Sequence, residues 1–276
     1  MFKPYGCADL SIFAAPTANY AVDSIGCYRF SRYVRLLQSD VEKEISFDRA
    51  MNFYKWEENL RFFLFKVISF IEIAFRSAVV YEMFAITKDP FWYMEKSLFK
   101  DKLYESNLRE IEKSVKIAGD RDVLDFRRQF GKEVALPCWI LAEFVSFGKW
   151  SRLLGSLKKR VQIRIIANRL GILPENLVSW IRSLATLRNL CAHHSILWNR
   201  HIPNSPNGKV IEEQGWNRDL LGSRLFVILA FLNKHFSNRE DFLFEINKII
   251  EECPECNCRA MLGISPNFLN AHGRRS

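Results

Sequence analysis

The sequence predicts an all-α protein, a multi-helix bundle with an N-terminal helical extension. First, apolar residues recur at spacings of three and four along most of the chain, which is the period of an amphipathic helix. Second, no stretch of useful length alternates apolar and polar residues as a half-buried strand does. Third, 49% of the 276 residues are hydrophobic and only 12 are glycine, a composition that suits a compact helical protein.

The N-terminal part holds the longest helical pattern. Residues 1–26 lack clear periodicity and contain two prolines and two glycines, so they form either an irregular arm packed on the body or a poorly ordered terminus. Residues 28–41 carry an apolar face at helical spacing and predict the first helix. Residues 48–87 predict a second, with Asp48 as its N-cap and a stop before Asp89-Pro90.

Shorter helical patterns fill the rest of the chain. Pro137 suits the first turn of its helix, Gly148 allows a helix end, and residues 203–208 (Pro-Asn-Ser-Pro-Asn-Gly) predict a loop. The predicted helices after residue 90 cover residues 96–115, 123–130, 137–147, 150–157, 177–191, 220–235 and 241–252.

No linker divides the chain sharply. We expect residues 1–119 to form an N-terminal helical region and residues 120–276 a second helical domain with a C-terminal tail, unless the two are one continuous domain. The best membrane candidate, residues 62–75, is short and contains two charges, so we expect a buried helix and no membrane span. No signal-peptide pattern opens the sequence, so the seven cysteines are expected to be reduced thiols in the cytoplasm.

The charge balance favours a polyanionic partner. The formal net charge is +9, from 40 Lys and Arg against 31 Asp and Glu. Nucleic acid is the simpler partner, and an acidic membrane surface is the alternative.

The C-terminal cysteines Cys253, Cys256 and Cys258 suggest a zinc site, but such sites need a second ligand pair, and His272 is the only later candidate. The chain also lacks the phosphate-loop, dinucleotide-binding and HExxH motifs. We therefore expect no metal and no cofactor.

The strongest chemical signal is a short basic segment near residue 190. Residues 188–193 are Arg-Asn-Leu-Cys-Ala-His, and three of the five histidines fall between His193 and His201. A guanidinium stabilises phosphate charge, and an imidazole moves protons near neutral pH. Metal-independent cleavage of RNA needs that pair of groups. The other interpretation is a helix end, where basic groups complement the helix dipole and the histidines are packed.

Helical spacing predicts which of these groups share a face. Asn189 and His193 lie at i and i+4, so the amide can orient the imidazole. Arg188 is about 140° away around the helix, but its long side chain can reach the same ligand. His194 points elsewhere and is the weaker catalytic candidate. No acidic residue within the motif completes a triad with Ser195.

Two basic groups outside this motif are candidates for contacts with RNA phosphates. One is a stripe at i, i+3 and i+6 on the first predicted helix, and the other is the densest basic stretch of the chain. For each, a solvated face is one interpretation and binding of the RNA backbone is the other. The stripe consists of Arg29, Arg32 and Arg35, and the stretch consists of Lys158, Lys159, Arg160, Arg164 and Arg169.

Residues 188–193 resemble the R-x4-6-H signature of HEPN domains. The wider chain resembles the Abi-like proteins, the AbiD/AbiF group of bacterial abortive-infection proteins. The supporting segments occur in family order. They are residues 27–33 (CYRFSRY), 71–77 (IEIAFRS), 139–148 (ending in EFVSFG), 188–200 and 261–266 (MLGISP).

The resemblance implies an all-α multi-helix bundle of HEPN type with an N-terminal helical extension, in which residues 120–276 form the HEPN-like domain. It implies a metal-independent endoribonuclease of phage defence that leaves 2′,3′-cyclic phosphate ends. His193 would then act as acid or base, Arg188 would stabilise the phosphorane, and Asn189 would fix the ring or donate to phosphate. HEPN enzymes bring two motifs to one cleft, so the single copy here implies a homodimer.

The resemblance leaves two further points open. Glu72 and Arg76 are an i, i+4 pair in an apolar stretch, where charges need partners. Structural pairing is one interpretation, and a place beside Arg188 and His193, holding RNA phosphate or the catalytic groups, is the other. Some members of the group associate with a small non-coding RNA, so the second functional hypothesis is a non-catalytic RNA-binding module regulated by such an RNA.

Overall fold

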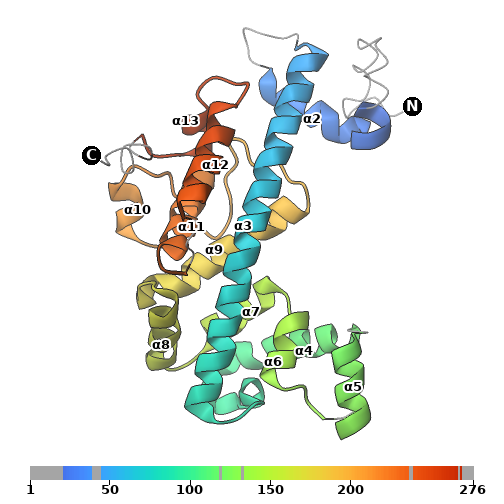
Figure 1. The fold of residues 1–276 in the computed structure, drawn as a ribbon, viewed down its shortest axis with the longest axis vertical. Helices are drawn as coiled ribbons and strands as arrows, with labels where there is room; N and C mark the ends of the chain where they lie inside the picture. The colour runs from blue at the N-terminus through green and yellow to red at the C-terminus, as the bar shows by residue number, and fades with distance from the viewer. Residues whose placement is uncertain are drawn as a thin grey trace.

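The other elements of the structure pack around one central helix of 41 residues (Figure 1). A computed structural model describes residues 21–38, 45–117, 120–131, 134–235, 239–266 and 268. Helix α3 (Phe47–Thr87) runs the length of the molecule, about 60 Å at 1.5 Å per residue, and the other elements pack around it (Figure 1). The remaining α-helices are α2 (Cys27–Leu37), α4 (Asp101–Ile117), α5 (Arg121–Phe130), α6 (Cys138–Phe144), α7 (Phe147–Ser156), α8 (Arg160–Leu170), α9 (Pro174–Ala192), α10 (Lys209–Glu213), α11 (Leu221–His235), α12 (Arg239–Glu251) and α13 (Cys258–Leu262).

The prediction of an all-α bundle is confirmed. Short π and 3-10 segments, η2 (Ala21–Ile25), η3 (Trp92–Met94) and η4 (Lys96–Leu98), complete the described secondary structure. Within the described ranges, the single β feature is an isolated antiparallel bridge between Phe99 and Leu157. None of the described helices has the length and hydropathy that a membrane span requires.

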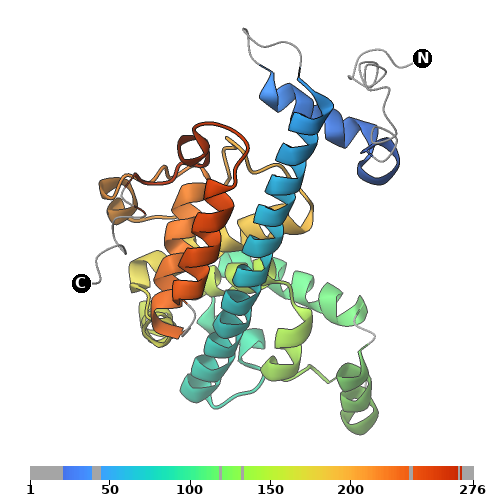
Figure 2. The same ribbon diagram turned by 45° about the horizontal axis from the view of Figure 1, so that its top comes forward.

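The arrangement places α9 across the middle of α3. Helix α2 packs near the start of α3, and α8 and α9 pack on it farther along (Figure 1). Helices α11 and α12 lie side by side against α3, as Figure 2 shows. Helix α7 packs on α9, and α4 and α6 continue the bundle toward the other end of α3. The end of α9 therefore lies close to α3 and to α2.

The buried side chains form one continuous core. It extends from Phe30 to Phe268 and includes a cluster in which the Trp198 ring packs edge-on against Phe53 and Trp56, with ring centroids 5.0 and 5.6 Å away. The division between residues 119 and 120 stays a prediction.

Several predicted boundaries need correction. Ser46, and not Asp48, caps α3, because its hydroxyl accepts the Arg49 N–H at 3.3 Å while Asp48 lies in the first turn. The predicted helix 137–147 breaks at Val145, where the backbone is extended, and Gly148 lies inside α7. Pro137 is the N-cap of α6 and not its first helical residue. Helices α10 and α13 had no clear periodic signal, since each has only five residues.

Other predicted boundaries agree more closely. Helix α3 ends at Thr87, where Lys88 adopts a left-handed conformation, just before Asp89-Pro90. The loop at residues 203–208 is confirmed, since these residues are irregular. The predicted first helix extends into residues 39–44, which lie outside the described residues, as do residues 1–20 and His272.

Candidate functional site

The residues of the Arg-x4-His motif surround the end of α9. Pro174 opens this helix at a position that suits proline, and Ala192 is its last helical residue. His193 is the C-cap, and its N–H donates to the Asn189 carbonyl at 2.9 Å. His193 therefore lies at the helix boundary and not within the helix, although it still follows Asn189 by one turn.

The chain turns sharply immediately after His193. His194 has a φ of 52°, in the left-handed region, and the Ser195 N–H donates to the Leu190 carbonyl at 2.8 Å. This hydrogen bond and the left-handed residue form a Schellman motif, a helix ending in which glycine usually takes the left-handed position. A histidine there costs conformational free energy, so the surrounding contacts must hold it.

Two such contacts hold the turn. The Arg29 guanidinium of α2 donates to the His194 carbonyl at 3.1 Å. The His194 ring lies edge-on to the Phe62 ring of α3, with centroids 6.3 Å apart. Both histidine side chains and the Asn189 amide are exposed to solvent. No hydrogen bond joins the Asn189 amide to the His193 ring in this described part of the chain, so their predicted side-chain contact is not formed here.

Arg188 lies between α9 and α3 and faces a buried carboxylate. Its Nε is 3.5 Å from Glu72 Oε2, and its guanidinium carbon is 5.2 Å from the centre of the Phe65 ring. The Glu72 side chain is only 7% exposed, whereas that of Arg188 is 32% exposed. The buried carboxylate thus forms an ion pair with Arg188 without a hydrogen bond, and the Arg188 side chain remains partly exposed to solvent.

The same carboxylate also binds Arg76. The Arg76 Nη2 donates to Glu72 Oε1, so the i, i+4 pair predicted from the sequence is formed. We call Glu72, Arg76 and Arg188 the Glu72 cluster. The two interpretations of the Glu72–Arg76 pair are compatible, because a structural ion pair also lies in contact range of the motif arginine.

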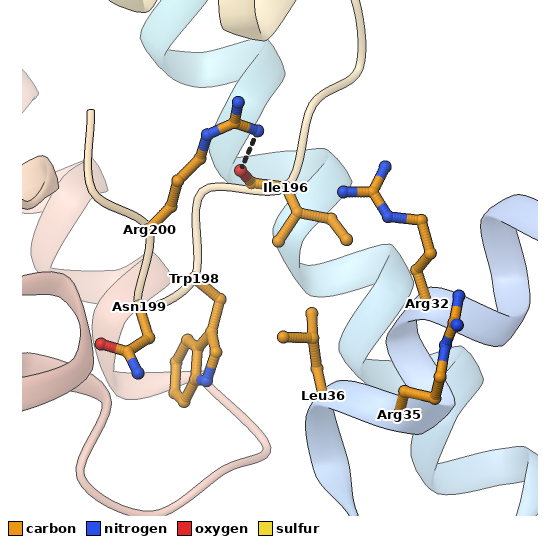
Figure 3. Close-up of a pocket in the computed structure, with 7 residues that line it drawn as sticks. All are labelled: Arg32, Arg35, Leu36, Ile196, Trp198, Asn199 and Arg200. Atoms are coloured by element: carbon orange, nitrogen blue, oxygen red, sulfur yellow. Dashed lines mark hydrogen bonds between the residues drawn. The ribbon is translucent and has the colours of Figure 1, made fainter. Parts of the chain in front are cut away.

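The basic stripe of α2 lies beside the motif segment. Besides the contact of Arg29 with His194, the exposed Arg32 and Arg35 line a pocket whose other side is formed by residues 196 and 198–200 (Figure 3). Three of the predicted phosphate-binding residues are therefore close to the segment that follows His193.

The second basic stretch, at the start of α8, is separate from these contacts. The side chains of Lys158, Lys159, Arg160 and Arg164 are exposed. Arg169 differs, since it pairs with Glu82 at 3.0 Å and stacks over the Tyr81 ring at 4.2 Å. Arg169 is thus occupied by α3, while the four others face solvent.

Sequence reasoning missed a buried carboxylate that positions the segment after the motif. Glu57 is fully buried, and its Oε1 accepts the backbone N–H groups of Leu197 and Trp198 at 2.7 and 2.8 Å. Its Oε2 accepts from the Tyr33 hydroxyl at 2.7 Å and from Arg61 at 2.6 Å. Glu57 and Arg61 have the same i, i+4 spacing as Glu72 and Arg76, so the sequence did contain a signal.

A second buried residue holds the chain farther on. Arg224 is fully buried and donates to the carbonyls of Ile202, Pro203 and Leu220 at 2.6, 3.2 and 3.0 Å. The loop that follows the motif is thus held by hydrogen bonds to Glu57 at residues 197–198 and from Arg224 at residues 202–203.

The cysteines offer no metal centre among the described residues. Cys253 and Cys258 are near enough for a hydrogen bond between their thiols, which lowers the pKa of Cys253. No group of three or more histidine, cysteine, aspartate or glutamate side chains within the described ranges could hold a metal ion. Burial raises the pKa of Cys191, inside the motif, to about 12, so this thiol is protonated at neutral pH.

The Abi-like protein family model matches residues 20–199, from the segment before α2 through the motif. The chain belongs to the Abi-like protein family. This family match covers the α2 stripe, both glutamate–arginine pairs of α3 and the whole of α9. Membership points to a part in abortive infection, a response of bacteria to phage. No curated protein and no solved structure matches this Abi-like chain significantly.

Proposed function

We propose that this Abi-like protein is a metal-independent endoribonuclease of the HEPN type that acts in phage defence. One observation carries the proposal. Arg188 lies near the end of α9 and pairs with the buried Glu72 of α3, and the exposed His193 follows it by five residues as the C-cap of α9. A fixed guanidinium and an accessible imidazole are the two groups that phosphodiester cleavage by an internal nucleophile requires. We propose that it acts in the cytoplasm.

In the proposed reaction the ribose 2′-oxygen attacks the adjacent phosphorus, and the bond to the 5′-oxygen of the next nucleotide breaks. His193 takes the proton from the 2′-hydroxyl or gives one to the leaving 5′-oxygen. Arg188 stabilises the charge on the phosphorane, with its planar fork matched to two phosphate oxygens. Asn189 donates to phosphate or fixes the imidazole. The products carry 2′,3′-cyclic phosphate and 5′-hydroxyl ends, and DNA, which lacks the 2′-hydroxyl, is not cut.

Each chain supplies one motif, so we propose that two copies assemble a composite site. An exposed apolar stripe on α3 runs next to the Glu72 cluster and suits this contact. At 100° per residue, Phe62, Phe70 and Ile73 share a face of the helix, and Ile73 is 61% exposed. Beside Ile73 a pocket of about 250 Å³ is lined in part by Arg76 and the half-exposed Trp139. A second copy covering this stripe brings its own motif close to Arg188.

We further propose that RNA is held by the basic side chains around the site. The α2 stripe and the exposed residues from Lys158 to Arg164 would contact phosphates, and their affinity for RNA should fall steeply with salt.

The test of the catalytic proposal compares four single variants on one RNA. His193→Ala and Arg188→Ala should each lower the rate of cyclic-phosphate formation by about 10²–10⁴-fold, because each removes proton transfer or charge stabilisation. His194→Ala should have a smaller effect, and His201→Ala is the matched control because its exposed ring lies beside Asp219 and outside the motif. RNA binding by the His193→Ala protein should survive.

Two results would change this proposal. If the wild-type protein binds RNA but forms no cyclic-phosphate ends with any RNA, including RNA from infected cells, a non-catalytic module regulated by a small non-coding RNA becomes the better account. If His194→Ala is inactive and His193→Ala is active, the catalytic histidine has been assigned to the wrong position.

The dimer is tested separately by light scattering over a concentration series. Ile73→Glu should weaken association and lower cleavage with it, because the charge falls within the apolar stripe. Phe244→Glu is the matched control, since Phe244 is an exposed aromatic residue of α12. A persistent wild-type monomer with full nuclease activity would contradict the composite site.

A further inference from the structure

A pocket of about 460 Å³ lies beside the motif, between α2 and the segment that follows α9. Ligand-binding pockets in proteins typically measure about 300–1,000 Å³, so this one can hold a single small molecule or one unit of a polymer. Figure 3 shows Arg32 and Arg35 on the α2 side, and Asn199 and Arg200 on the other.

Among the described residues that line the pocket, every charged side chain is a cation. Three guanidinium groups line it, from Arg32, Arg35 and Arg200, and none of its described lining residues is a carboxylate. The Arg35 Nε–H donates to the Ser31 carbonyl at 3.3 Å. One Nη1–H of Arg200 donates to the Ile196 carbonyl at 3.2 Å (Figure 3). A guanidinium has five N–H donors, so these contacts orient each group and leave donors for a ligand. The pocket is therefore suited to an anion with several acceptor oxygens.

Three of the remaining lining residues are apolar. Leu36, Ile196 and Trp198 form an apolar wall, and the indole of Trp198 is fixed by its edge-on packing against Phe53 and Trp56. The backbone of Trp198 is held by Glu57. Apolar side chains beside three cations are more than a phosphate ion needs, and they match a ligand that carries both a flat apolar group and phosphates (Figure 3).

Asn199 adds a polar side chain to this wall. Its φ is 45°, in the left-handed region that asparagine tolerates better than most residues, and its N–H donates to the Met261 carbonyl at 3.1 Å. The exposed amide is thereby held at the pocket by a fixed backbone. An amide offers both a donor and an acceptor, which is what the hydrogen-bonding edge of a nucleobase requires.

We propose that this pocket binds one nucleotide of an RNA strand next to the scissile phosphate. The base lies against Leu36, Ile196 and Trp198, the Asn199 amide contacts the base edge, and the three arginines bind the flanking phosphates. The pocket begins three residues after His193, and Arg29, on the same helix as Arg32, donates to the His194 carbonyl, so pocket and motif are one continuous surface. This inference rests on the proposed ribonuclease activity and adds Asn199 as a residue that determines base preference.

The probes are the four ribonucleoside 3′,5′-bisphosphates, which carry a phosphate on both sides of the nucleoside and contain no bond that the enzyme can cleave. Titration calorimetry on the full-length protein should show at least one bisphosphate binding tenfold or more tightly than inorganic phosphate. Arg32→Gln and Arg35→Gln should each weaken this binding at least fivefold. The matched control is Arg121→Gln, an exposed arginine of α5, which should stay within twofold of wild type.

The base contact is tested by Asn199→Gly, which removes the amide but allows the positive φ. This variant should reduce the difference in affinity among the four bisphosphates, and in cleavage assays it should change the preferred base beside the cut. Unchanged base preference would overturn the role of Asn199. Bisphosphates that bind no better than inorganic phosphate would overturn the nucleotide assignment.

The outcomes separate this inference from the ribonuclease proposal. If RNA is cleaved and the pocket variants match Arg121→Gln in both assays, the pocket assignment fails and the activity stands. If no RNA is cleaved but bisphosphates bind in a way that depends on Arg32 and Arg35, the pocket stands and the activity fails. If a free nucleoside triphosphate binds more tightly than every bisphosphate and short RNA does not displace it, the ligand is a free nucleotide and the assignment to an RNA strand is overturned.

Discussion

Two glutamate–arginine pairs on α3 share the same spacing but lie in different surroundings. The carboxylate of Glu57 is fully buried and accepts four hydrogen bonds, from Arg61, Tyr33 and two backbone N–H groups. The carboxylate of Glu72 is also buried, but its partners Arg76 and Arg188 are 18% and 32% exposed. The first pair is enclosed by protein, whereas the second joins the interior to a surface arginine. The same i, i+4 pattern can therefore stabilise the fold or position a surface arginine, depending on what its carboxylate meets.

The largest expected effect is on the buried pair. Glu57→Gln should lower the free energy of unfolding by about 3 kcal/mol, because it leaves the buried Arg61 without its counter-charge and replaces an acceptor with a donor. Chemical denaturation monitored by circular dichroism measures this loss. Glu105→Gln, at an exposed position of α4, is the control and should stay within about 0.5 kcal/mol of wild type. An equally small change for Glu57→Gln would remove the distinction between the two pairs.

The second prediction concerns Glu72, whose substitution should affect the cleavage rate more than the stability of the fold. Glu72→Gln should cost only about 1 kcal/mol of stability, because both arginine partners reach solvent. Its cleavage rate should fall at least tenfold, since Arg188 loses the anion that positions it. The loss should appear in kcat with KM little changed, because Glu72 acts through Arg188 and does not touch RNA. A loss of stability with unchanged kcat would make Glu72 purely structural.

The smallest expected effect concerns the pH dependence of the Glu57 network. Burial and the neighbouring Glu57 raise the pKa of Tyr33 well above its usual value. The folded state thus favours the neutral Tyr33 phenol, whereas in the unfolded chain this phenol ionises near pH 10. Tyr33 therefore contributes stability that is complete below pH 10 and is lost as the pH rises further.

Tyr33→Phe tests this contribution. The variant should be less stable than wild type by about 1 kcal/mol at pH 7, because the hydroxyl's hydrogen bonds to the Glu57 carboxylate and from Arg61 are lost. The difference should narrow between pH 10 and pH 11. Urea denaturation at both pH values measures it, with Tyr28→Phe, at an exposed tyrosine, as the control. A difference that stays constant with pH would show that Tyr33 ionises alike in both states.

Local patterns in the sequence predicted most of the longer helices, although not α8, and they predicted the contacts between helices poorly. The end of α3 before Asp89-Pro90 and the apolar face of α9 follow from the nearest neighbours in the chain. The predicted N-cap, Asp48, lies two residues after the observed one, Ser46, an error that is typical of helix ends. The break at Val145 could not be predicted from apolar spacing, because the pattern continues through it.

The candidate site shows the same limit. Spacing placed Asn189 and His193 on one face, but it could not show that His193 ends the helix and that a left-handed His194 follows. The Glu72–Arg76 pair was visible locally, whereas its contact with Arg188 depends on how α3 crosses α9. The pocket formed by Arg32, Arg35 and Arg200 joins distant parts of the chain, and no local pattern describes it.

The hydrogen bonds from Leu197 and Trp198 to Glu57 have a consequence for biosynthesis. They join residues 140 and 141 positions apart, and the contact from Arg29 to His194 spans 165. A chain emerging from the ribosome cannot close these contacts until Leu197 and Trp198 are accessible, and until then Oε1 of Glu57 lacks the two backbone N–H groups that it binds in the folded protein. Chains that end before Trp198 therefore lack the complete carboxylate-bound loop, and chains that end before Arg188 also lack the motif. For the ribonuclease proposed above, this order of assembly means that chains ending before Trp198 are inactive.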